Sequence, residues 1–267
     1  MLTRIMCVGP SRAYEAAVTL SFDDRIDAHI DQTIIVSSYH ESQLKHLWNT
    51  FEIDYQHIKF MYDTDVQLPI WTDHHWYRQQ GIKLELLSTI DSDSFLIQDC
   101  DVFMLKAYSP FNQGPVFRVE DLWNNYQTVY ADAVEQLIGE VRTVPFSFVT
   151  EIMPYYKQDW LDCAALIQRR HGPWQQSIPA WRKFDESKWF SEYELLGIYK
   201  THVSCEYGME RDVHPRLDTW EDVWETDWHR VPSVKFKSRP LKFMTKSQAQ
   251  NLVQYFRALI EIGRAHV

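Results

Sequence analysis

The N-terminal part of the chain alternates short strand-like runs with longer segments of helical spacing, and this order constrains the fold more than any other feature. Four runs rich in β-branched and aromatic residues are predicted strands: TRIMCV, TIIVSSY, HIKFMY and FLIQD, which begin at residues 3, 33, 57 and 95. Such alternation predicts an α/β fold with a mostly parallel central sheet flanked by helices. Ligands of such sheets gather at the carboxyl ends of the strands.

The C-terminal half is less regular and reads mainly as helix. Helices are predicted over 122–139, 154–172, 189–203 and from 245 onward, and a further strand over 144–151. Because no repeat and no long linker divides the sequence, we expect a single domain over residues 1–261.

The last six residues stand apart. The run IGRAHV, residues 262–267, looks like a translated sequencing adapter, so we expect it to be a non-native tail.

Composition and cysteine spacing favour a folded cytoplasmic protein. Hydrophobic residues make up 45% of the chain, and no stretch approaches the roughly 18 consecutive apolar residues of a membrane span. The first twenty residues do not read as a secretory signal. We expect free thiols in a reducing compartment, because no CxxC spacing joins the four cysteines, Cys7, Cys100, Cys163 and Cys205.

The formal charge of −10 argues against a protein that mainly binds nucleic acid. One segment runs against this balance: RVPSVKFKSRPLKFMTK, residues 230–246, has six basic residues and no acid. Lys235 and Arg239 could belong to a lid that closes over an anionic ligand. The alternative is an ordinary solvated surface.

The run FLIQDCDVFML places Asp99 and Asp101 among apolar residues, where an unpaired carboxylate costs several kcal/mol. If the segment is extended, both side chains project to the same face and Cys100 points away. Mg²⁺ or Mn²⁺ would compensate both charges and leave coordination positions for the oxygens of a diphosphate. We therefore predict a divalent-cation site at the end of this strand.

A helix is predicted over 73–91, with Asp73 as its N-cap and Trp76, Gln80, Lys83 and Leu87 on one face. Gln80 and Lys83 could point into a cleft, where the lysine binds a phosphate or a sugar hydroxyl. The alternative is a lysine that extends along the surface of the helix into solvent.

Three segments, HWYRQQGIKLELL, LIQDCDVFML and WFSEYELLGIY, together resemble a GT-A-type nucleotide-sugar glycosyltransferase-like family of bacteria and phages, over roughly residues 1–204. The resemblance implies a metal-dependent transfer of a sugar from a nucleotide-sugar donor to an acceptor hydroxyl, for instance of a glycan precursor. It also implies that Asp99 and Asp101 hold the metal against the donor diphosphate. Residues 1–110 would bind the donor and residues 111–261 the acceptor.

The resemblance suggests further donor-binding residues. Gln80 and Lys83 become donor-cleft residues, and Pro10, Ser11 and Arg12 become candidates for the base or ribose. Ser11 could instead cap the first helix. Asp63 and Asp65 could bind the base as well, although we favour a turn there.

An inverting transfer needs a general base, for which Glu192 and Glu194 are the candidates, with Glu192 preferred. The alternative is that both acids only stabilise a helix N-terminus that Ser191 caps. In a retaining transfer neither need act as a base. Spacing does not select a third metal ligand among His202, His214 and His229.

Other functions stay open. If the source is viral, a hydroxymethylated DNA base is an alternative acceptor, favoured by the basic segment and opposed by the net charge. A non-catalytic nucleotide- or sugar-binding protein of the same fold is another. A nucleotidyltransferase lacks support because no glycine-rich phosphate loop is present.

The stripe of Trp220, Trp224 and Trp228 could be an acceptor platform, or the core face of a helix.

Overall fold

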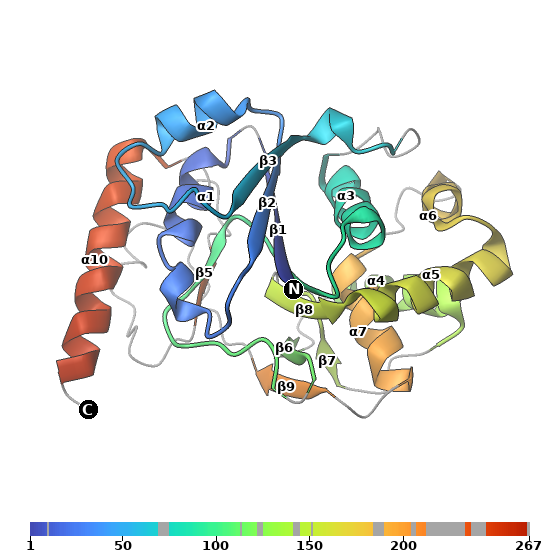
Figure 1. Ribbon diagram of the computed structural model, residues 1–267. Helices are drawn as coiled ribbons and strands as arrows, with labels where there is room; N and C mark the ends of the chain where they lie inside the picture. Colours follow the sequence, from blue (N-terminus) through green and yellow to red (C-terminus); the bar gives the residue numbers. More distant parts are fainter. Residues whose placement is uncertain are drawn as a thin grey trace. The chain divides into compact units, whose positions relative to one another are not determined.

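The computed structural model shows an alternation of strands and helices in the N-terminal part of the chain (Figure 1). The residues that it describes are 1–9, 11–68, 75–112, 114–121, 125–140, 145–150, 152–183, 190–203, 207–211, 233–235 and 244–265.

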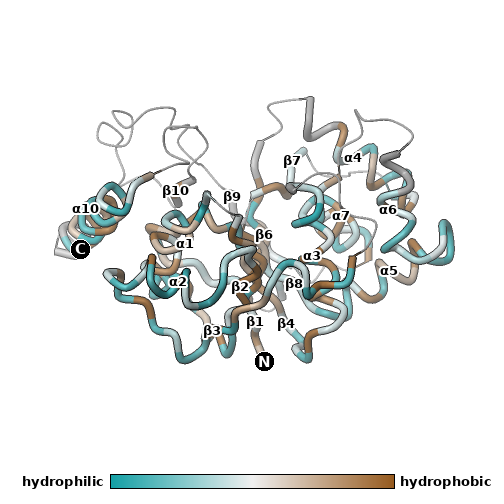
Figure 2. Tube along the Cα trace, turned by 90° about the horizontal axis from the view of Figure 1, so that it is seen from above, coloured by the Kyte–Doolittle hydropathy of each residue, from teal (hydrophilic) through white to brown (hydrophobic). Residues whose placement is uncertain are grey.

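The central sheet has five strands in the order β3-β2-β1-β4-β8. β2 pairs in parallel with β3, and β1 in parallel with β4. All seven residues of β1 are buried, and Figure 2 shows hydrophobic residues along the central strands. The predicted α/β fold with a mostly parallel sheet is therefore confirmed. The bounds are Leu2–Val8 for β1, Gln32–Ser37 for β2, Ile58–Tyr62 for β3, Ser94–Gln98 for β4 and Ile152–Tyr156 for β8.

The chain divides into two compact units, which are described separately. The first comprises Met1–Ile5, Asp63–Ile97 and Pro110–Arg211, and the second Met6–Tyr62, Gln98–Ser109 and Asp212–Val267.

In the second unit, an aromatic core joins the helices to a small sheet. The unit holds α1 (Ala13–Leu20), α2 (Glu41–Leu47) and α10 (Lys246–Ala265), and an antiparallel pair of β5 (Val102–Met104) with β10 (Ser233–Lys235). α10 packs against α1 (Figure 1). The ring of Phe103 stacks on Phe22, with centroids 4.7 Å apart, and meets Phe256 of α10 edge-on. The predicted C-terminal helix is thus part of this core.

The first unit is mostly helical. α3 and α4 each pack against α5 and α7. Gly197 of α7 lies so close to the ring of Phe148 that no side chain would fit there. The helices are α3 (His75–Thr89), α4 (Asn125–Ile138), α5 (Lys157–His171), α6 (Trp174–Lys183) and α7 (Glu192–Val203), beside a sheet in the order β7-β6-β9, formed by Phe146–Ser147, Val116–Asp121 and Gly208–Arg211.

Two predicted elements were wrong in extent. The helix expected from residue 154 begins at Lys157, because Pro154 belongs to β8. β8 is the last strand of the sheet, and an edge strand tolerates a residue without an N–H. The strand expected over 144–151 is reduced to the two residues of β7. Asp63 and Asp65 lie in a short 3₁₀ helix, consistent with the expected turn.

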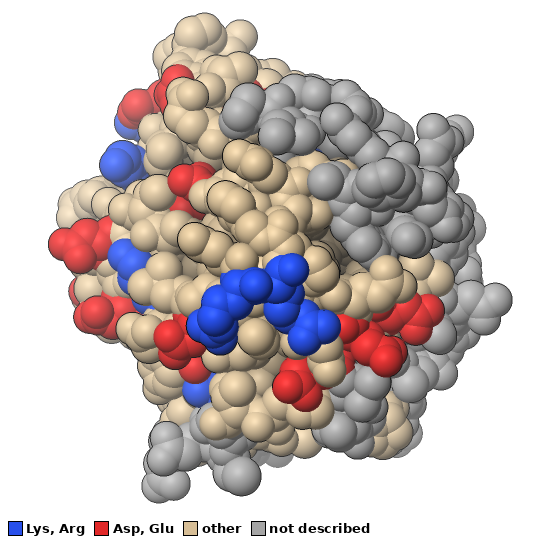
Figure 3. All heavy atoms as spheres, turned by 90° about the vertical axis from the view of Figure 1, so that its right-hand side faces the viewer, with Lys and Arg blue, Asp and Glu red and all other residues tan. Residues whose placement is uncertain are grey.

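Several features of composition can be compared with the structure. Cys7, Cys100 and Cys163 are buried free thiols, as expected. Within the described part of the chain, no helix combines the length and apolar character needed to cross a membrane. On the face in Figure 3, Lys and Arg side chains lie between Asp and Glu side chains, so its described residues present no uniformly basic surface.

Candidate functional site

Asp99 and Asp101 lie in a turn between β4 and β5, and the prediction of an extended segment was wrong. The N–H of Val102 donates to the carbonyl of Asp99 at 3.4 Å, and Nε2 of Gln98 donates to the carbonyl of Val102 at 2.8 Å. The chain turns here because β5 pairs with β10 in a separate sheet and does not continue β4. Asp101 is buried and Asp99 half-buried.

Arg12 compensates the charge of Asp101. Its Nη1 lies 3.3 Å from Oδ2 of Asp101. Arg12 itself is the N-cap of α1, and its N–H donates to the carbonyl of Gly9 at 3.0 Å. The alternative role of Ser11 as the cap is therefore wrong, and its side chain is exposed. Pro10 lies outside the described residues.

Glu15, a residue that sequence reasoning missed, joins this group from the first turn of α1. Its Oε1 lies 3.5 Å from the same Nη1 of Arg12, and the residue is only 1% exposed. Burial raises the pKa of Glu15 to about 7, and Asp101 adds to the rise while Arg12 opposes it. The available signal was an acid in the otherwise largely apolar run AYEAAVTL.

We call Arg12, Glu15, Asp99 and Asp101 the Arg12 cluster. Burial lowers the pKa of the Arg12 guanidinium, but the nearby carboxylates outweigh this effect and the net pKa is raised. Nη1 of Arg12 and Oε1 of Glu15 are both buried, and neither has a hydrogen-bond partner within the described ranges. The contacts of Nη1 with Asp101 and Glu15 are therefore ion pairs without good hydrogen-bond geometry.

The strand order explains why this cluster is a candidate binding site. From β1 the order runs to β2 and β3 on one side and to β4 on the other. Ligands of such sheets bind outside the carboxyl ends of the strands, at the point where the order reverses. Arg12 follows β1 and Asp101 follows β4, so both belong to this point.

A pocket of about 440 Å³ lies beside the ends of β2 and β3. Half of the residues that line it carry a ring, and those of His40 and Tyr62 meet edge-on with centroids 4.8 Å apart. The lining includes Tyr39, His40, Lys45, Phe60 and Tyr62. Flat rings beside polar groups suit a planar or sugar-like ligand.

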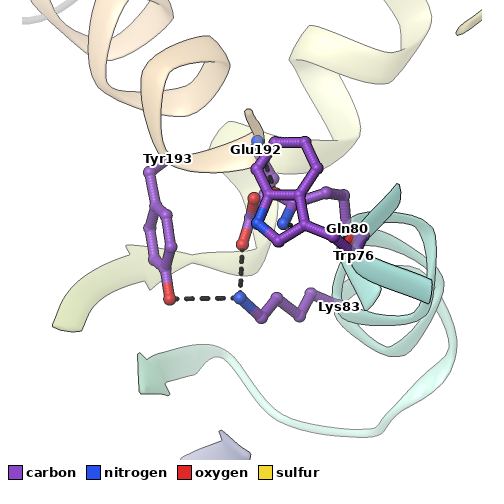
Figure 4. Close-up of polar contacts among 5 residues, drawn as sticks. All are labelled: Trp76, Gln80, Lys83, Glu192 and Tyr193. Carbon is purple, nitrogen blue, oxygen red and sulfur yellow. Dashed lines mark hydrogen bonds and ion pairs between the residues drawn. The ribbon is translucent and has the colours of Figure 1, made fainter. Parts of the chain in front are cut away.

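A second cluster of predicted residues joins α3 to α7 in the first unit (Figure 4). Nζ of Lys83 donates to Oε1 of Glu192 at 2.7 Å and to the hydroxyl of Tyr193 at 3.2 Å. Lys83 is 1% exposed and Glu192 is fully buried. The alternative of a surface lysine was therefore wrong: the ammonium group is held by a carboxylate 109 residues away.

Gln80 completes this group, which we call the Lys83 cluster: Gln80, Lys83, Glu192 and Tyr193. Oε1 of Gln80 accepts the N–H of Glu192 at 3.2 Å and so caps α7 (Figure 4). The expected capping by Ser191 was wrong, because its buried hydroxyl has no hydrogen-bond partner in the described parts of the chain. Asp73, the expected cap of α3, lies outside the described residues.

Glu194 has a different environment from Glu192, although the two lie in the same turn of helix. Its Oε2 accepts the hydroxyl of Ser147 at 2.9 Å and the N–H of Phe148 at 3.0 Å. The carboxylate therefore ties α7 to β7 and satisfies a backbone donor in the core.

The remaining residues that the sequence suggested do not add a metal ligand among the described positions. Nδ1 of His202 lies 3.0 Å from a carboxylate oxygen of Glu140. No group of three or more His, Cys, Asp and Glu side chains suited to a metal occurs in the residues that the structure describes. The described positions do not include His214, His229, Arg239, the Trp220, Trp224 and Trp228 stripe or the side chain of Lys235.

Comparison with solved structures identifies the fold. The chain is similar to the galactosyltransferase LgtC in complex with donor and acceptor sugar analogs, with a TM-score of 0.52, and to an active-site mutant of LgtC, with a TM-score of 0.54. Each match has 13% sequence identity and covers 95% of both chains. No family model and no curated protein matches the sequence. The chain therefore has a GT-A-like glycosyltransferase fold.

Proposed function

We propose that the protein is a metal-dependent glycosyltransferase that moves a sugar from a nucleotide-diphosphate sugar to an acceptor hydroxyl of a glycan precursor. The observation that carries this proposal is the turn of Asp99 and Asp101 beside Arg12, at the switch point of a glycosyltransferase fold. One of the similar LgtC structures is a complex with donor and acceptor sugar analogs, which supports the same two substrate classes here.

Asp99 and Asp101 suit a divalent cation. Both carry hard carboxylate oxygens, and Asp101 already pairs with a positive group, the guanidinium of Arg12. Mg²⁺ usually keeps several waters and binds through one or two carboxylates plus substrate phosphates, so two aspartates suffice. We propose that they hold Mn²⁺ or Mg²⁺, which when bound neutralises charge that develops on the leaving diphosphate.

For the nucleoside part of the donor we propose the edge of the sheet beyond β1. Ser11 is exposed in the segment after β1, and the aromatic pocket follows beside β2 and β3. A base can stack on the rings that line this pocket. Tyr62→Ala is expected to raise the KM for the donor, whereas Tyr62→Phe keeps the ring and should leave the KM near its original value.

We further propose Gln80 and Lys83 as donor ligands and Glu192 as the general base, the roles that the sequence resemblance suggests for them. In an inverting transfer the acceptor oxygen bonds to the anomeric carbon as the bond to the diphosphate breaks, and Glu192 takes the hydroxyl proton. Loss of such a base lowers kcat by about 10²–10⁴-fold. Glu194→Gln is the matched control, because Glu194 is occupied by Ser147 and Phe148.

The first test is a thermal-shift screen of nucleotide sugars with and without Mn²⁺. A donor that binds only the folded state raises the Tm, because it stabilises that state by RT ln(1 + L/Kd), where L is the free donor concentration. The test variant is Asp99→Ala/Asp101→Ala. The control is Asp91→Ala/Asp93→Ala, which has the same spacing at the amino end of β4 and removes two exposed carboxylates.

The expected result is a donor-specific shift that needs Mn²⁺, is lost in Asp99→Ala/Asp101→Ala and persists in the control. A shift without metal would support a nucleotide- or sugar-binding protein that is not metal-dependent. The absence of any shift with every donor would contradict the proposed donor site.

A further inference from the structure

Arg12 lies between two carboxylates that compete for one nitrogen atom. Its Nη1 is 3.3 Å from Oδ2 of Asp101 and 3.5 Å from Oε1 of Glu15. Across the described residues this nitrogen has no partner with hydrogen-bond geometry. Arg12 is therefore held by charge and is not fixed to either acid by directed bonds.

Glu15 has no evident role in packing. α1 is otherwise buried through small and apolar side chains such as Ala16, Ala17 and Val18. A buried carboxylate is unfavourable unless it is paired, and an apolar residue of similar size would serve the core better. A carboxylate at this position is therefore better explained by its interaction with a charged partner, and the charged group beside it is Arg12.

We propose that Glu15 is the exchange partner of Arg12. When Asp99 and Asp101 take up a divalent cation, Asp101 gives up Arg12, and Arg12 moves to pair with Glu15. A bound divalent cation would repel the guanidinium beside it, and Glu15, whose Oε1 already lies 3.5 Å from Nη1, can then become the main partner of Arg12. This inference rests on the proposed function, because it takes Asp99 and Asp101 as the cation ligands.

In the absence of the cation, Arg12 keeps Asp101 compensated. Glu15 lowers the cost of releasing Arg12, so it sets the affinity of the site for the cation. Glu15 is then a positioning residue that acts through Arg12 and does not touch the cation.

The test is a Mn²⁺ titration of the full chain at pH 8, with free Mn²⁺ followed by its electron paramagnetic resonance signal and no donor present. Arg12→Gln should tighten Mn²⁺ binding and Glu15→Gln should weaken it, each on the order of tenfold, within the usual range of coupling between sites. Matched controls are Lys59→Gln and Glu52→Gln, which remove the same charges from exposed positions of the same unit.

The double variant Arg12→Gln/Glu15→Gln separates exchange from simple electrostatics. If Glu15 acts only through Arg12, the second substitution changes Mn²⁺ affinity by less than about twofold once Arg12 is gone, because coupled residues are not additive. If Glu15 only adds negative charge, the two effects add. Additive effects, or an unchanged affinity in Glu15→Gln, would overturn the inference.

Two further measurements keep the test decisive. If Glu15→Gln does not fold, Glu15→Met removes the same carboxylate with a similar volume and should weaken Mn²⁺ binding equally. If the unaltered protein binds no Mn²⁺, or binds it equally well in Asp99→Ala/Asp101→Ala, the proposed metal site itself is wrong. Failure of the exchange alone leaves that site intact, so the two failures can be told apart.

Discussion

The Lys83 cluster and the Arg12 cluster both bury charged side chains, but they satisfy those charges differently. Lys83 makes directed hydrogen bonds to Glu192 and Tyr193. Arg12 faces Asp101 and Glu15 at 3.3 and 3.5 Å without such geometry. Its side chain is also 21% exposed, whereas that of Lys83 is 1% exposed.

The difference separates a charge that is fixed by directed hydrogen bonds from one that is ready to change partners. A buried ion pair with good geometry is costly to break, because the remaining charge has no water to replace its partner. The pair of Arg12 and Asp101 has looser geometry and partly exposed side chains, so it can be exchanged at lower cost. The two clusters therefore predict different responses to the same kind of substitution, and three substitutions test this: Lys83→Met, Glu15→Gln and Arg12→Gln.

Lys83→Met should have the largest effect on stability. It leaves Glu192 buried without its ammonium partner, and removal of one member of a buried pair costs about 3–5 kcal/mol. The free energy of unfolding is measured by urea denaturation. Lys59→Met, an exposed lysine on β3, is the control and should change it little. A loss below about 1 kcal/mol would mean that water or another group compensates Glu192.

Glu15→Gln should have a smaller effect that depends on pH. The pKa of Glu15 is raised from 4.5 to about 7 by burial, so its contribution to stability is fully present below pH 4.5 and is lost as pH rises through 7. The difference between these pKa values corresponds to about 3 kcal/mol. Measured without metal, the free energy of unfolding of Glu15→Gln should therefore increase relative to that of the unaltered protein between pH 4.5 and 8. A pH-independent difference would contradict the raised pKa.

The strands and helices of the N-terminal part could be predicted because each has a local pattern. β1 to β4 are short apolar runs, and the buried face of α3 follows helical spacing from Gln80 to Leu87. The turn at Asp99 had no such pattern, since an apolar run on both sides reads as one long strand. Only the pairing of β5 with β10, far along the chain, shows where β4 ends.

The members of the two clusters were mostly visible in the sequence, but their pairings were not. Lys83 and Glu192 were predicted as separate candidates, and no pattern in one sequence links residues so far apart. Glu15 and Tyr193 were missed. Glu15 could have been found as an acid on a small apolar helix, whereas Tyr193 differs in no local way from other tyrosines.

Ser147→Ala tests the tie between α7 and β7. It removes the hydrogen bond from the Ser147 hydroxyl to Oε2 of Glu194, an atom that also accepts the N–H of Phe148, and loss of a buried hydrogen bond to a charged group costs about 1.5–3 kcal/mol. Urea denaturation measures the loss, with Ser42→Ala, an exposed serine, as the control. If Glu194 is structural, the KM and kcat of the folded variant should stay unchanged. A specific fall in kcat would instead place Glu194 in the reaction.

Arg12→Gln should have the smallest effect on stability, about 1 kcal/mol or less at pH 6 without metal, as for partly exposed ion pairs. Water can reach Asp101, whose side chain is 12% exposed, and Glu15 can be neutral at this pH because its pKa is about 7. The same urea measurement compares this loss directly with that of Lys83→Met. Equal losses would show that Arg12 is as firmly built into the fold as Lys83. In that case Arg12 could not change partners at low cost, and the contrast between the two clusters would not hold.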